Sequence, residues 1–461
     1  MKTPIPLARG SFLFGNAAAL RKDPLGTLHR AWKKYGDLVE ISLPQRRMFV
    51  ASHPDLVSEI FVHGKHRFLK PAAQPGSEGL ELVLGNGLVT NPEHDSWLPQ
   101  RRMIQPMFHR RRIAQMGQTM VTAIADMLAR WEKSYPSGTM LDLHHEMTAV
   151  TLDIINRTMF STTGADQQAD RVGAAVGLAA EFVFQRGRSL LRPPLSWPLP
   201  RHRAFLQSQA EMDQIIDRII QQRRLSGQQH DDLLDMLLAA RDEETGQGMS
   251  EAQLRDEVKT IFAAGHETTA NALTWTWYLL AQHPDALHRL QNELDHTLQG
   301  RLPTPEDLEN LPYTRQVFQE ALRLYPPAPL VPRYLPAAAP LGDHLLPPDS
   351  MLIVSIFNIH RHPDFWQRPD TFDPDRFSSE RSAGRHRYAF MPFGAGPRMC
   401  IGNHFAMLEG TLLLAATAQR YELQLLPDQT VETQVAVTMR PKEGLPMRLR
   451  ARQGKVIRPR S

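Results

Sequence analysis

The longest helical pattern in the chain begins after Ser250 and ends before Pro284. Ser250 and Gln253 have the spacing of a capping box, which satisfies free backbone N–H groups at the start of a helix. Pro284 ends the pattern because proline cannot continue a helix. About 32 residues at 1.5 Å each give a helix of roughly 48 Å. Such a helix is long enough to cross a whole domain, so it constrains the fold more than any other segment.

The middle of this helix, Ala264 to Thr269, contains residues that weaken helices. Gly265 costs about 1 kcal/mol relative to alanine, and the hydroxyls of Thr268 and Thr269 compete for backbone carbonyl groups. Local conflict inside a strong helix is expected at functional sites. The structural alternative is close helix packing at Gly265, with the threonine hydroxyls bonded inside the helix.

Cys400 is the only cysteine among 461 residues, so it forms no disulfide within the chain. It lies in a glycine-rich loop directly before an apolar helical pattern. The start of a helix and a nearby cation, Arg398, both favour the thiolate. A thiolate held in a tight loop is a good axial ligand for haem iron. The alternative is an inert buried thiol.

Composition excludes some classes of function. The apolar fraction of 42% and the charged fraction of 22% are typical of a globular protein. A net charge of +4 does not indicate a nucleic-acid partner. Residues 1–20 contain Lys2, Arg9 and helix breakers but no uninterrupted apolar run, so we expect neither a signal peptide nor a membrane span. A cytoplasmic setting fits best.

Alternating patterns predict strands near both ends of the chain. Residues 37–43 and 47–51 predict a hairpin around Pro44 and Gln45, and residues 421–425, 433–439 and 447–451 alternate in the same way. Residues 68–91 predict a long loop whose apolar residues favour folding over an apolar group.

Trp97 and Arg101 are four residues apart, so they share one helix face and could both reach an anion. A surface cation–π pair is the alternative. Glu320 and Arg323 also share a helix face, although such pairs contribute little when exposed.

Together these segments resemble the cytochrome P-450 family. The family's haem-binding signature, Phe-x-x-Gly-x-Arg-x-Cys-x-Gly, is matched at every defined position by Phe393, Gly396, Arg398, Cys400 and Gly402. The segment from Ala264 to Thr269 resembles the family's oxygen-activation motif. Five motifs occur in the family's order, and the resemblance covers essentially the whole chain.

The resemblance implies that the chain binds haem b, with Cys400 as the axial ligand of the iron. It assigns Glu267 and Thr268 to proton delivery. Glu320, Arg323 and Arg376 would lock together and brace the cysteine loop. The expected contacts of the haem and its propionates are His94, Trp97, Arg101, Arg333, His360, Phe393, Gly394, Arg398 and Gly402. The expected cavity residues are Leu82, Ala264, Leu330, Val331 and Met439.

The implied fold is mainly α with a small β lobe, the α+β triangular prism of the family with the long helix at its centre. Length alone would favour two domains. We instead expect residues 1–461 to form one domain. Its β lobe would contain roughly residues 35–60, 328–356 and 421–453, and helices the remainder.

The implied activity is monooxygenation, in which O2 is activated and a C–H bond of a large apolar substrate is hydroxylated. The chain looks most like soluble bacterial members that hydroxylate carotenoids and fatty acids, with terpenoids as a close alternative. A peroxide-driven peroxygenase would not require the Glu267–Thr268 pair. A non-catalytic haem-thiolate sensor would need neither that pair nor a roof over a substrate cavity.

Only 61 residues follow Cys400, too few for a flavin or iron–sulfur domain. We therefore expect electrons from NAD(P)H to arrive through a ferredoxin or flavodoxin and its reductase. The proline-rich segment 190–203 matches the family's F–G region, the mobile roof of the cavity, and is a candidate for peripheral membrane contact. An acidic partner would dock on basic residues, namely Arg102, Arg110, Arg111, Arg112, Arg385 and Arg387.

Overall fold

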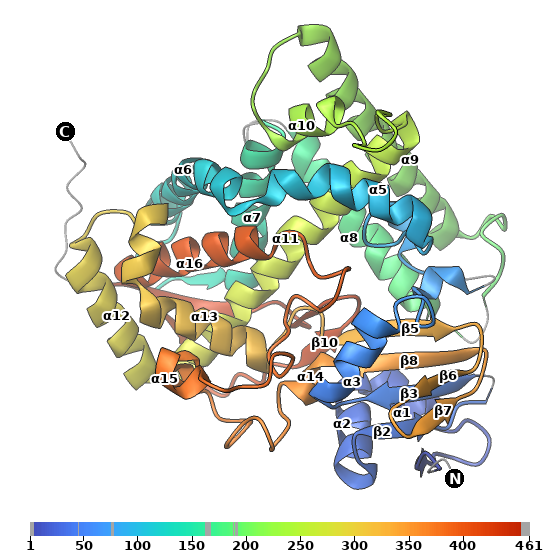
Figure 1. Ribbon diagram of the computed structural model, residues 1–461. Coiled ribbons are helices and arrows are strands. Elements are labelled where there is room, and N and C mark those ends of the chain that lie inside the picture. Colours follow the sequence, from blue (N-terminus) through green and yellow to red (C-terminus); the bar gives the residue numbers. More distant parts are fainter. Residues whose placement is uncertain are drawn as a thin grey trace.

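The computed structural model describes residues 4–44, 46–74, 78–161, 167–187, 189 and 192–452. Figure 1 shows a large helical part beside a smaller twisted sheet, with α11 passing through the middle of the helical part. The helices are α1 (Ala17–Lys22), α2 (Pro24–Tyr35), α3 (Pro54–Ser58), α4 (Glu81–Leu84), α5 (His94–Ile104), α6 (Arg110–Ser134), α7 (Leu143–Met159), α8 (Gln167–Gly187), α9 (Pro200–Ser226), α10 (Leu233–Ala239), α11 (Glu251–Gln282), α12 (Pro284–Leu298), α13 (Pro312–Leu324), α14 (Ile356–Ile359), α15 (Ser379–Ser382) and α16 (Asn403–Arg420).

The long helix α11 has the predicted limits. The Ser250 side chain accepts a hydrogen bond from the backbone N–H of Gln253 at 3.2 Å, which caps the helix, and Pro284 begins α12 directly after it. Helices α7, α9, α13 and α16 all pack against α11. The second half of α11 is buried on nearly every side, as expected for a helix that is apolar around its whole circumference.

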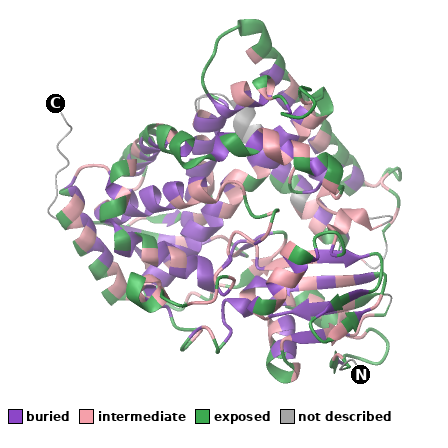
Figure 2. Cartoon of the chain, viewed as in Figure 1, coloured by how far each residue is buried: buried purple, intermediate pink, exposed green. Residues whose placement is uncertain are grey.

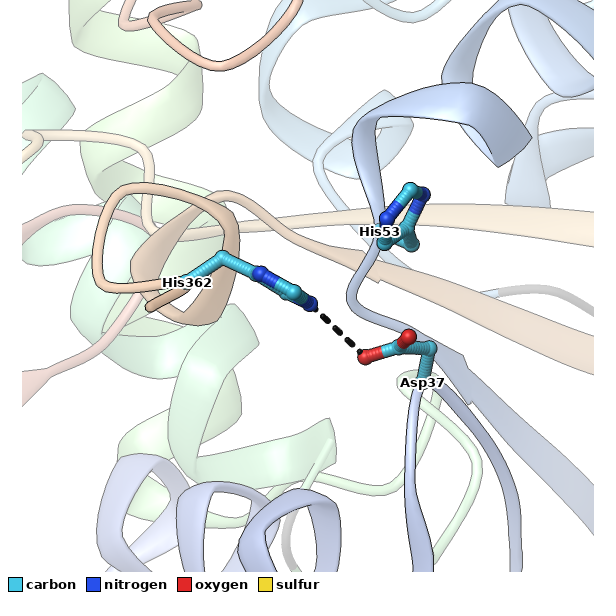
Figure 3. A group of neighbouring side chains, drawn as sticks. All are labelled: Asp37, His53 and His362. Atoms are coloured by element: carbon cyan, nitrogen blue, oxygen red, sulfur yellow. Dashed lines mark hydrogen bonds and ion pairs between the residues drawn. The ribbon is translucent and has the colours of Figure 1, made fainter. Parts of the chain in front are cut away.

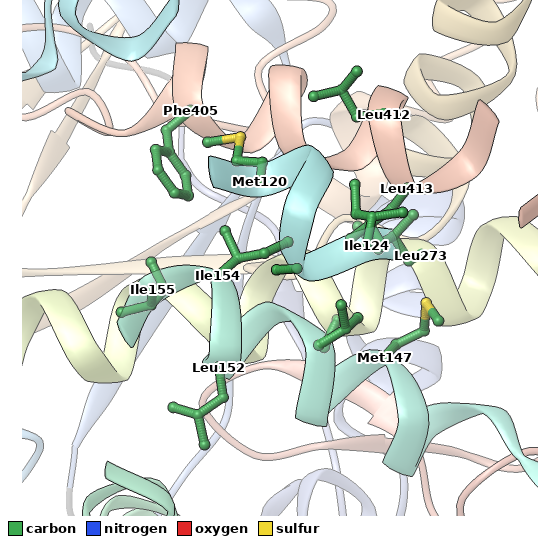
Figure 4. Packing of buried hydrophobic residues seen from close by; sticks show 14 of the residues in the cluster. Met120, Ile124, Met147, Leu152, Ile154, Ile155, Leu273, Phe405, Leu412 and Leu413 are labelled. Carbon is green, nitrogen blue, oxygen red and sulfur yellow. The ribbon is translucent and has the colours of Figure 1, made fainter. Parts of the chain in front are cut away.

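The main core lies where α6, α7, α11 and α16 meet. Figure 4 shows side chains from these four helices interleaving, among them Ile124, Ile154 and Leu273. Gly410 permits the close approach of α13 to α16, because a Cβ atom there would lie 2.2 Å from the ring of Phe318. Buried residues concentrate in this core and in the sheet, whereas the outer helix ends are exposed (Figure 2).

The larger sheet has the strand order β1-β2-β3-β8-β5. Strands β2 and β3 form the predicted antiparallel hairpin, although Gln45 of its turn lies outside the described residues. Strand β8 pairs parallel to β3 and antiparallel to β5, which joins the predicted segments 35–60 and 328–356. The strands are β1 (Leu7–Ala8), β2 (Leu38–Ile41), β3 (Arg47–Ala51), β5 (Leu330–Leu335) and β8 (Ser350–Ser355).

The prediction that residues 421–453 complete this lobe is wrong for the residues described, which end at 452. Strand β12 (Pro446–Ala451) instead pairs with β9 (Tyr421–Leu425) on one side and with β4 (Met140–Asp142) on the other, in a separate three-stranded sheet. The expected strand 433–439 is a hairpin of β10 (Thr433–Val435) and β11 (Met439–Pro441), because the chain reverses where the Ala436 N–H donates to the Thr438 carbonyl at 3.0 Å. A further hairpin joins β6 (Ala339–Leu341) and β7 (His344–Leu346).

The expected roof segment, 190–203, is described in part. Residues 190 and 191 lie outside the described residues, whereas Trp197 is 57% exposed and α9 begins at Pro200. Among the described residues, no helix combines the length and the apolar character that crossing a membrane requires.

Candidate functional site

An apolar cavity of about 320 Å³ separates the middle of α11 from the loop that carries Cys400. On one side it is lined by Ala264, Gly265 and Thr268 of α11, and on the other by residues 392–402. A second hollow adjoins it and shares six residues with it, namely Phe61, Lys70, Trp97, Arg333, Ala395 and Arg398.

The cysteine loop is shaped by its glycines. Gly394 and Gly396 have φ angles of +74° and +71°, which side chains rarely tolerate, and a Cβ atom at Gly396 would lie 2.5 Å from the Phe61 carbonyl oxygen. The Cys400 N–H donates to the Phe393 carbonyl at 2.9 Å, and Gly402 caps α16. Together these contacts hold Cys400 at the cavity wall, where Phe393, Gly394 and Gly402 also lie.

The surroundings of the Cys400 sulfur favour the neutral thiol when no cation is bound to it. Burial raises the pKa of the Cys400 thiol, while the Gly402 N–H and the charge of Arg101 oppose that rise. A metal cation at the sulfur would stabilise the thiolate, because coordinating thiols are deprotonated by the metal.

Lys70, Arg101, Arg333 and Arg398 bring four cationic side chains to the cavity. Burial and the charges of Arg333 and Arg398 lower the pKa of Lys70 well below its ordinary value. Burial likewise lowers the pKa of Arg333 to about 9 and that of Arg398 to about 10. Within the described part of the chain none of the four forms an ion pair with a carboxylate, so the site is built for an anionic ligand.

Arg398 and Arg333 are fixed in place. Arg398 donates to the Asn91 carbonyl at 2.7 Å and lies over the Trp97 ring, 4.3 Å from its centroid. Arg333 donates to its neighbour Pro332 at 2.8 Å and lies 4.5 Å from the centroid of Phe61. Arg101 donates to the Gln105 side chain at 3.2 Å.

Trp97 and His94 lie on the same side of the site as this cluster. The Trp97 indole N–H donates to the Leu88 carbonyl at 3.3 Å, and the His94 ring stacks on Trp97 with centroids 6.0 Å apart. His94 borders only the adjoining hollow, whereas Trp97 borders both.

The propionate contact predicted for His360 is contradicted by its position. His360 is fully buried, its Nδ1 donates to the Arg323 carbonyl at 3.1 Å, and its Nε2 accepts the Met391 N–H at 2.9 Å. Burial, together with the charges of Arg323 and Arg361, lowers the pKa of His360 to about 3. His360 therefore ties α13 to the chain before the cysteine loop and does not line the cavity, whereas Lys70, which the sequence did not single out, does.

Glu320, Arg323 and Arg376 form a buried cluster. Glu320 accepts from Arg323 Nε at 2.7 Å and from Arg376 Nε at 3.2 Å, and it also accepts the Asp373 N–H at 2.9 Å. Arg323 further donates to the carbonyls of His360 and Pro369, at 2.8 and 2.6 Å. These bonds join α13 to the segment that leads into the cysteine loop.

The residues in the middle of α11 divide between packing and the cavity. Gly265 allows α7 to approach, because a Cβ atom there would lie 2.6 Å from Ile155 Cδ1. The Thr268 hydroxyl borders the cavity and donates to the Ala264 carbonyl at 2.8 Å. The close helix packing at Gly265 and the hydrogen bond of Thr268 inside the helix are therefore both present, as the structural alternative predicts. Thr268 nevertheless borders the cavity.

Glu267 points away from the cavity. Its Oε1 accepts the Thr438 hydroxyl at 2.6 Å, and Asn271 Nδ2 donates to the same hydroxyl at 3.2 Å. The side-chain oxygen of Asn271, Oδ1, in turn lies 3.0 Å from His144 Nε2. Glu267 and Thr268 are adjacent in sequence, but their side chains form hydrogen bonds with different partners.

Of the expected cavity residues, Ala264 and Val331 line the cavity. The other three do not: Leu82 packs against the main core, Leu330 packs against the core beneath the sheet, and Met439 is fully buried, with its carbonyl accepting from Trp275 Nε1 at 3.1 Å. The sequence missed several lining residues, among them Leu88, Val89, Ile155, Met159, Glu257 and Ile261. The helical spacing of Glu257, Ile261, Ala264 and Thr268 was the signal that could have found those on α11.

Asp37, His53 and His362 form another cluster, far from Cys400 in the sequence (Figure 3). His362 Nδ1 accepts the Asp364 N–H, so its Nε2 carries the proton that it donates to Asp37 at 3.1 Å. His53 Nδ1 accepts the Asp55 N–H in the same way. His362 therefore directs an N–H group rather than a lone pair toward Asp37, which fits a hydrogen-bonded cross-link better than a metal site.

Comparison with known proteins identifies the family. The family profile described as "Cytochrome P450" matches residues 5–446. Cyclooctatin synthase of Streptomyces melanosporofaciens is 36% identical, and the match covers 94% of this chain and 93% of the relative. Pentalenene oxygenase of Streptomyces avermitilis is 32% identical, with 95% of both chains covered. The crystal structure of the cytochrome P450DA heme domain superposes with a TM-score of 0.89 at 28% identity, covering 98% of this chain and 99% of that one.

The chain belongs to the cytochrome P450 family and has its fold. It is a monooxygenase whose cofactor is haem b. The residues of the cavity fit this group, because they offer a sulfur ligand on one side and unpaired cations for two propionates at the edge. Cys400 would ligate the iron, and Lys70, Arg101, Arg333 and Arg398 would hold the propionates.

Proposed function

We propose that this monooxygenase hydroxylates a large apolar terpenoid, using electrons from a separate acidic protein. The observation that supports this proposal is the apolar lining of the cavity that Cys400 borders. The side chains that form this apolar wall are those of Ile155, Met159, Ile261 and Val331. Burial of apolar ligand surface contributes about 25 cal/mol per Å². The relatives named cyclooctat-9-en-7-ol 5-monooxygenase and pentalenene oxygenase favour a terpenoid over a carotenoid or a fatty acid.

When bound, a thiolate-ligated haem supplies oxygen activation and O–O bond cleavage. The apolar wall orients the substrate and excludes water. Thr268 Oγ1, now bonded to Ala264, would turn toward the cavity to pass a proton. Glu267, held by Thr438, would replenish that proton, which is the work of a positioned acid.

The substrate class can be tested by titrating the haem-loaded enzyme with a cyclic diterpene, a carotenoid and palmitic acid. The spin-state shift of the Soret band should occur at the lowest concentration with the diterpene, and oxidised diterpene should form with reductase and NADPH. Tighter binding and faster turnover of palmitic acid would refute the proposed substrate class. Turnover that proceeds with hydrogen peroxide alone, at the same rate as with reductase, would favour a peroxygenase.

Two of the basic residues that the sequence assigned to the docking face, Arg102 and Arg385, are engaged by other groups of the protein. Arg102 is paired with Asp242 at 3.1 Å and with Glu244, so its charge is largely compensated. Arg385 lies over the Trp366 ring, 4.4 Å from its centroid, and donates to the Arg376 carbonyl. Neither side chain is free for a partner.

We infer that Arg110, Arg111, Arg112 and Arg387 form the docking face, because all four are exposed. Arg110 Nε lies 3.4 Å from His404 Nε2, four residues after Cys400, which brings the start of α6 to the cysteine side of the site. Charge attraction speeds encounter and is screened over about 8 Å at physiological ionic strength.

Charge reversal tests this docking face. In stopped-flow reduction by an acidic ferredoxin, the rate for wild type should fall steeply with salt, and the Arg110→Glu/Arg112→Glu variant should show a flatter dependence. Arg201→Glu/Arg203→Glu, which reverses two exposed arginines on α9, serves as the charge-matched control. Equal salt slopes for wild type and the α6 variant would refute the docking face.

A further inference from the structure

The wall of the cavity contains two polar side chains whose hydrogen-bonding capacity is incompletely used. Glu257 and Thr260 both belong to α11 and both line the cavity. Glu257 is fully buried and Thr260 is 4% exposed. Among the described residues, neither Glu257 Oε1 nor Thr260 Oγ1 has a hydrogen-bond partner. Because they are three residues apart, both side chains lie on one face of the helix.

The contacts around this pair hold it in position. Glu257 Oε2 accepts the Leu88 N–H at 3.1 Å, and the neighbouring Asn86 N–H donates to Asp256 at 2.8 Å. Gly87 lies directly against Thr260, since a Cβ atom at residue 87 would be 2.1 Å from Thr260 Oγ1. The segment from Asn86 to Leu88 is thus fastened to α11, and only one carboxyl oxygen of Glu257 is engaged in the fastening.

The unpaired atoms cost free energy in the protein alone. A buried polar group without a partner destabilises the fold, because the hydrogen bonds that it made to water in the unfolded chain are not replaced. Burial, aided by the charge of Asp256, raises the pKa of Glu257 to about 8, so the carboxyl is mostly neutral at pH 7 and can both donate and accept a hydrogen bond. A ligand group that does the same would satisfy both residues.

We propose that Glu257 and Thr260 bind a hydroxyl group on the otherwise apolar substrate. The enzyme would then act on a terpenoid alcohol, and an earlier oxygenation or hydration must supply that hydroxyl. This inference deepens the proposed function and rests on it.

The position of the pair also constrains where the substrate is oxidised. Thr260 and Thr268 are eight residues apart on α11, which corresponds to about 12 Å along the helix axis. A large terpenoid can span that distance. The hydroxyl and the oxidised carbon should therefore lie near opposite ends of the molecule.

Matched ligand pairs test the proposal by calorimetry on the haem-loaded enzyme. One pair is cedrene and its alcohol cedrol, and the other is decane and 1-decanol. Wild type should prefer each alcohol over its hydrocarbon by about fivefold more than the Glu257→Leu/Thr260→Val variant does, since one hydrogen bond contributes about 1 kcal/mol.

Three further variants distinguish the proposed role from a merely structural effect. Glu257→Gln keeps a neutral group that can bond both Leu88 and a hydroxyl, so it should retain the preference. Ile261→Val changes the same wall without removing a polar atom and should also retain it. Thr260→Val alone conserves shape and should lose part of the preference.

The outcomes separate the two proposals. An alcohol preference that is unchanged in the double variant, or absent from wild type, overturns the role of Glu257 and Thr260. Failure of cedrol and cedrene to bind, with a Glu257-dependent preference for decanol, overturns the terpenoid proposal and supports the hydroxyl site. Binding of neither pair overturns both.

Discussion

Replacing Glu257 by glutamine should change how the stability of this protein depends on pH. Burial raises the pKa of the Glu257 carboxyl from its ordinary value of 4.5 to about 8, with a smaller contribution from Asp256, while the Leu88 N–H opposes the rise. In the unfolded chain the carboxyl ionises at its ordinary pKa. Between these two values the folded protein therefore holds one proton more than the unfolded chain.

The sign and size of the effect follow from proton linkage. Stability falls as pH rises wherever the folded state holds more protons, by about 1.4 kcal/mol for each pH unit. The penalty is absent below the ordinary pKa, grows between the two values and is complete above the raised one, where it reaches at most about 5 kcal/mol. Glutamine does not ionise, so the variant carries none of this penalty.

The assay is thermal unfolding of haem-loaded wild type and Glu257→Gln from about pH 5 to about pH 9. At roughly 2 °C for each kcal/mol in a chain of this size, the melting temperature of the variant relative to wild type should rise by roughly 5–10 °C across that range. Glu309→Gln removes the same charge at an exposed position and should run parallel to wild type. Parallel curves for Glu257→Gln and wild type would refute the burial of an ionisable carboxyl at this position.

Three further predictions concern the haem site. Lys70→Met should release haem to apomyoglobin roughly ten- to a hundredfold faster than wild type, because a charged hydrogen bond contributes about 1.5–3 kcal/mol. Lys22→Met, at an exposed position, is the control. If Lys70→Met released haem no faster than this control, Lys70 would not belong to the propionate site. Thr268→Ala should raise peroxide release per NADPH at the expense of product, whereas Thr276→Ala, whose hydroxyl makes the same bond to the carbonyl four residues earlier at 2.7 Å, should stay coupled; unchanged coupling would exclude Thr268 from proton delivery. Glu320→Gln should destabilise the fold by about 3–5 kcal/mol, because it leaves the buried Arg323 and Arg376 without their carboxylate; a melting temperature within 2 °C of wild type, on the order of 1 kcal/mol, would contradict that role.

The sequence determined much of the site because several determinants are local. The glycines of the cysteine loop, the cap at Ser250 and the spacing of Glu320 and Arg323 act over a few residues, so their consequences can be read from neighbours in the chain. The hairpin of β2 and β3 is local in the same sense.

Other features depended on contacts between distant segments. His360 matches a family pattern, but its ring is used by Arg323 and Met391, and only the packing of α13 against the chain before the loop reveals that. Lys70 lies in a long loop with no periodicity, and its cationic neighbours come from β5 and the cysteine loop. The sequence also could not show that β12 would pair with β4, because that strand lies about 300 residues earlier in the chain.

The same distinction applies to the cavity. The sequence identified α11 as its wall because a periodic helix has a definite face. It could not show that Leu82, Leu330 and Met439 would all face away from the cavity, because apolar side chains are equally suited to the core. Nor could it show that Glu257 and Thr260 keep unpaired atoms, since satisfaction of a polar atom depends on every segment packed against it. Tertiary packing alone decides such questions, because burial and partnership are properties of the assembled fold.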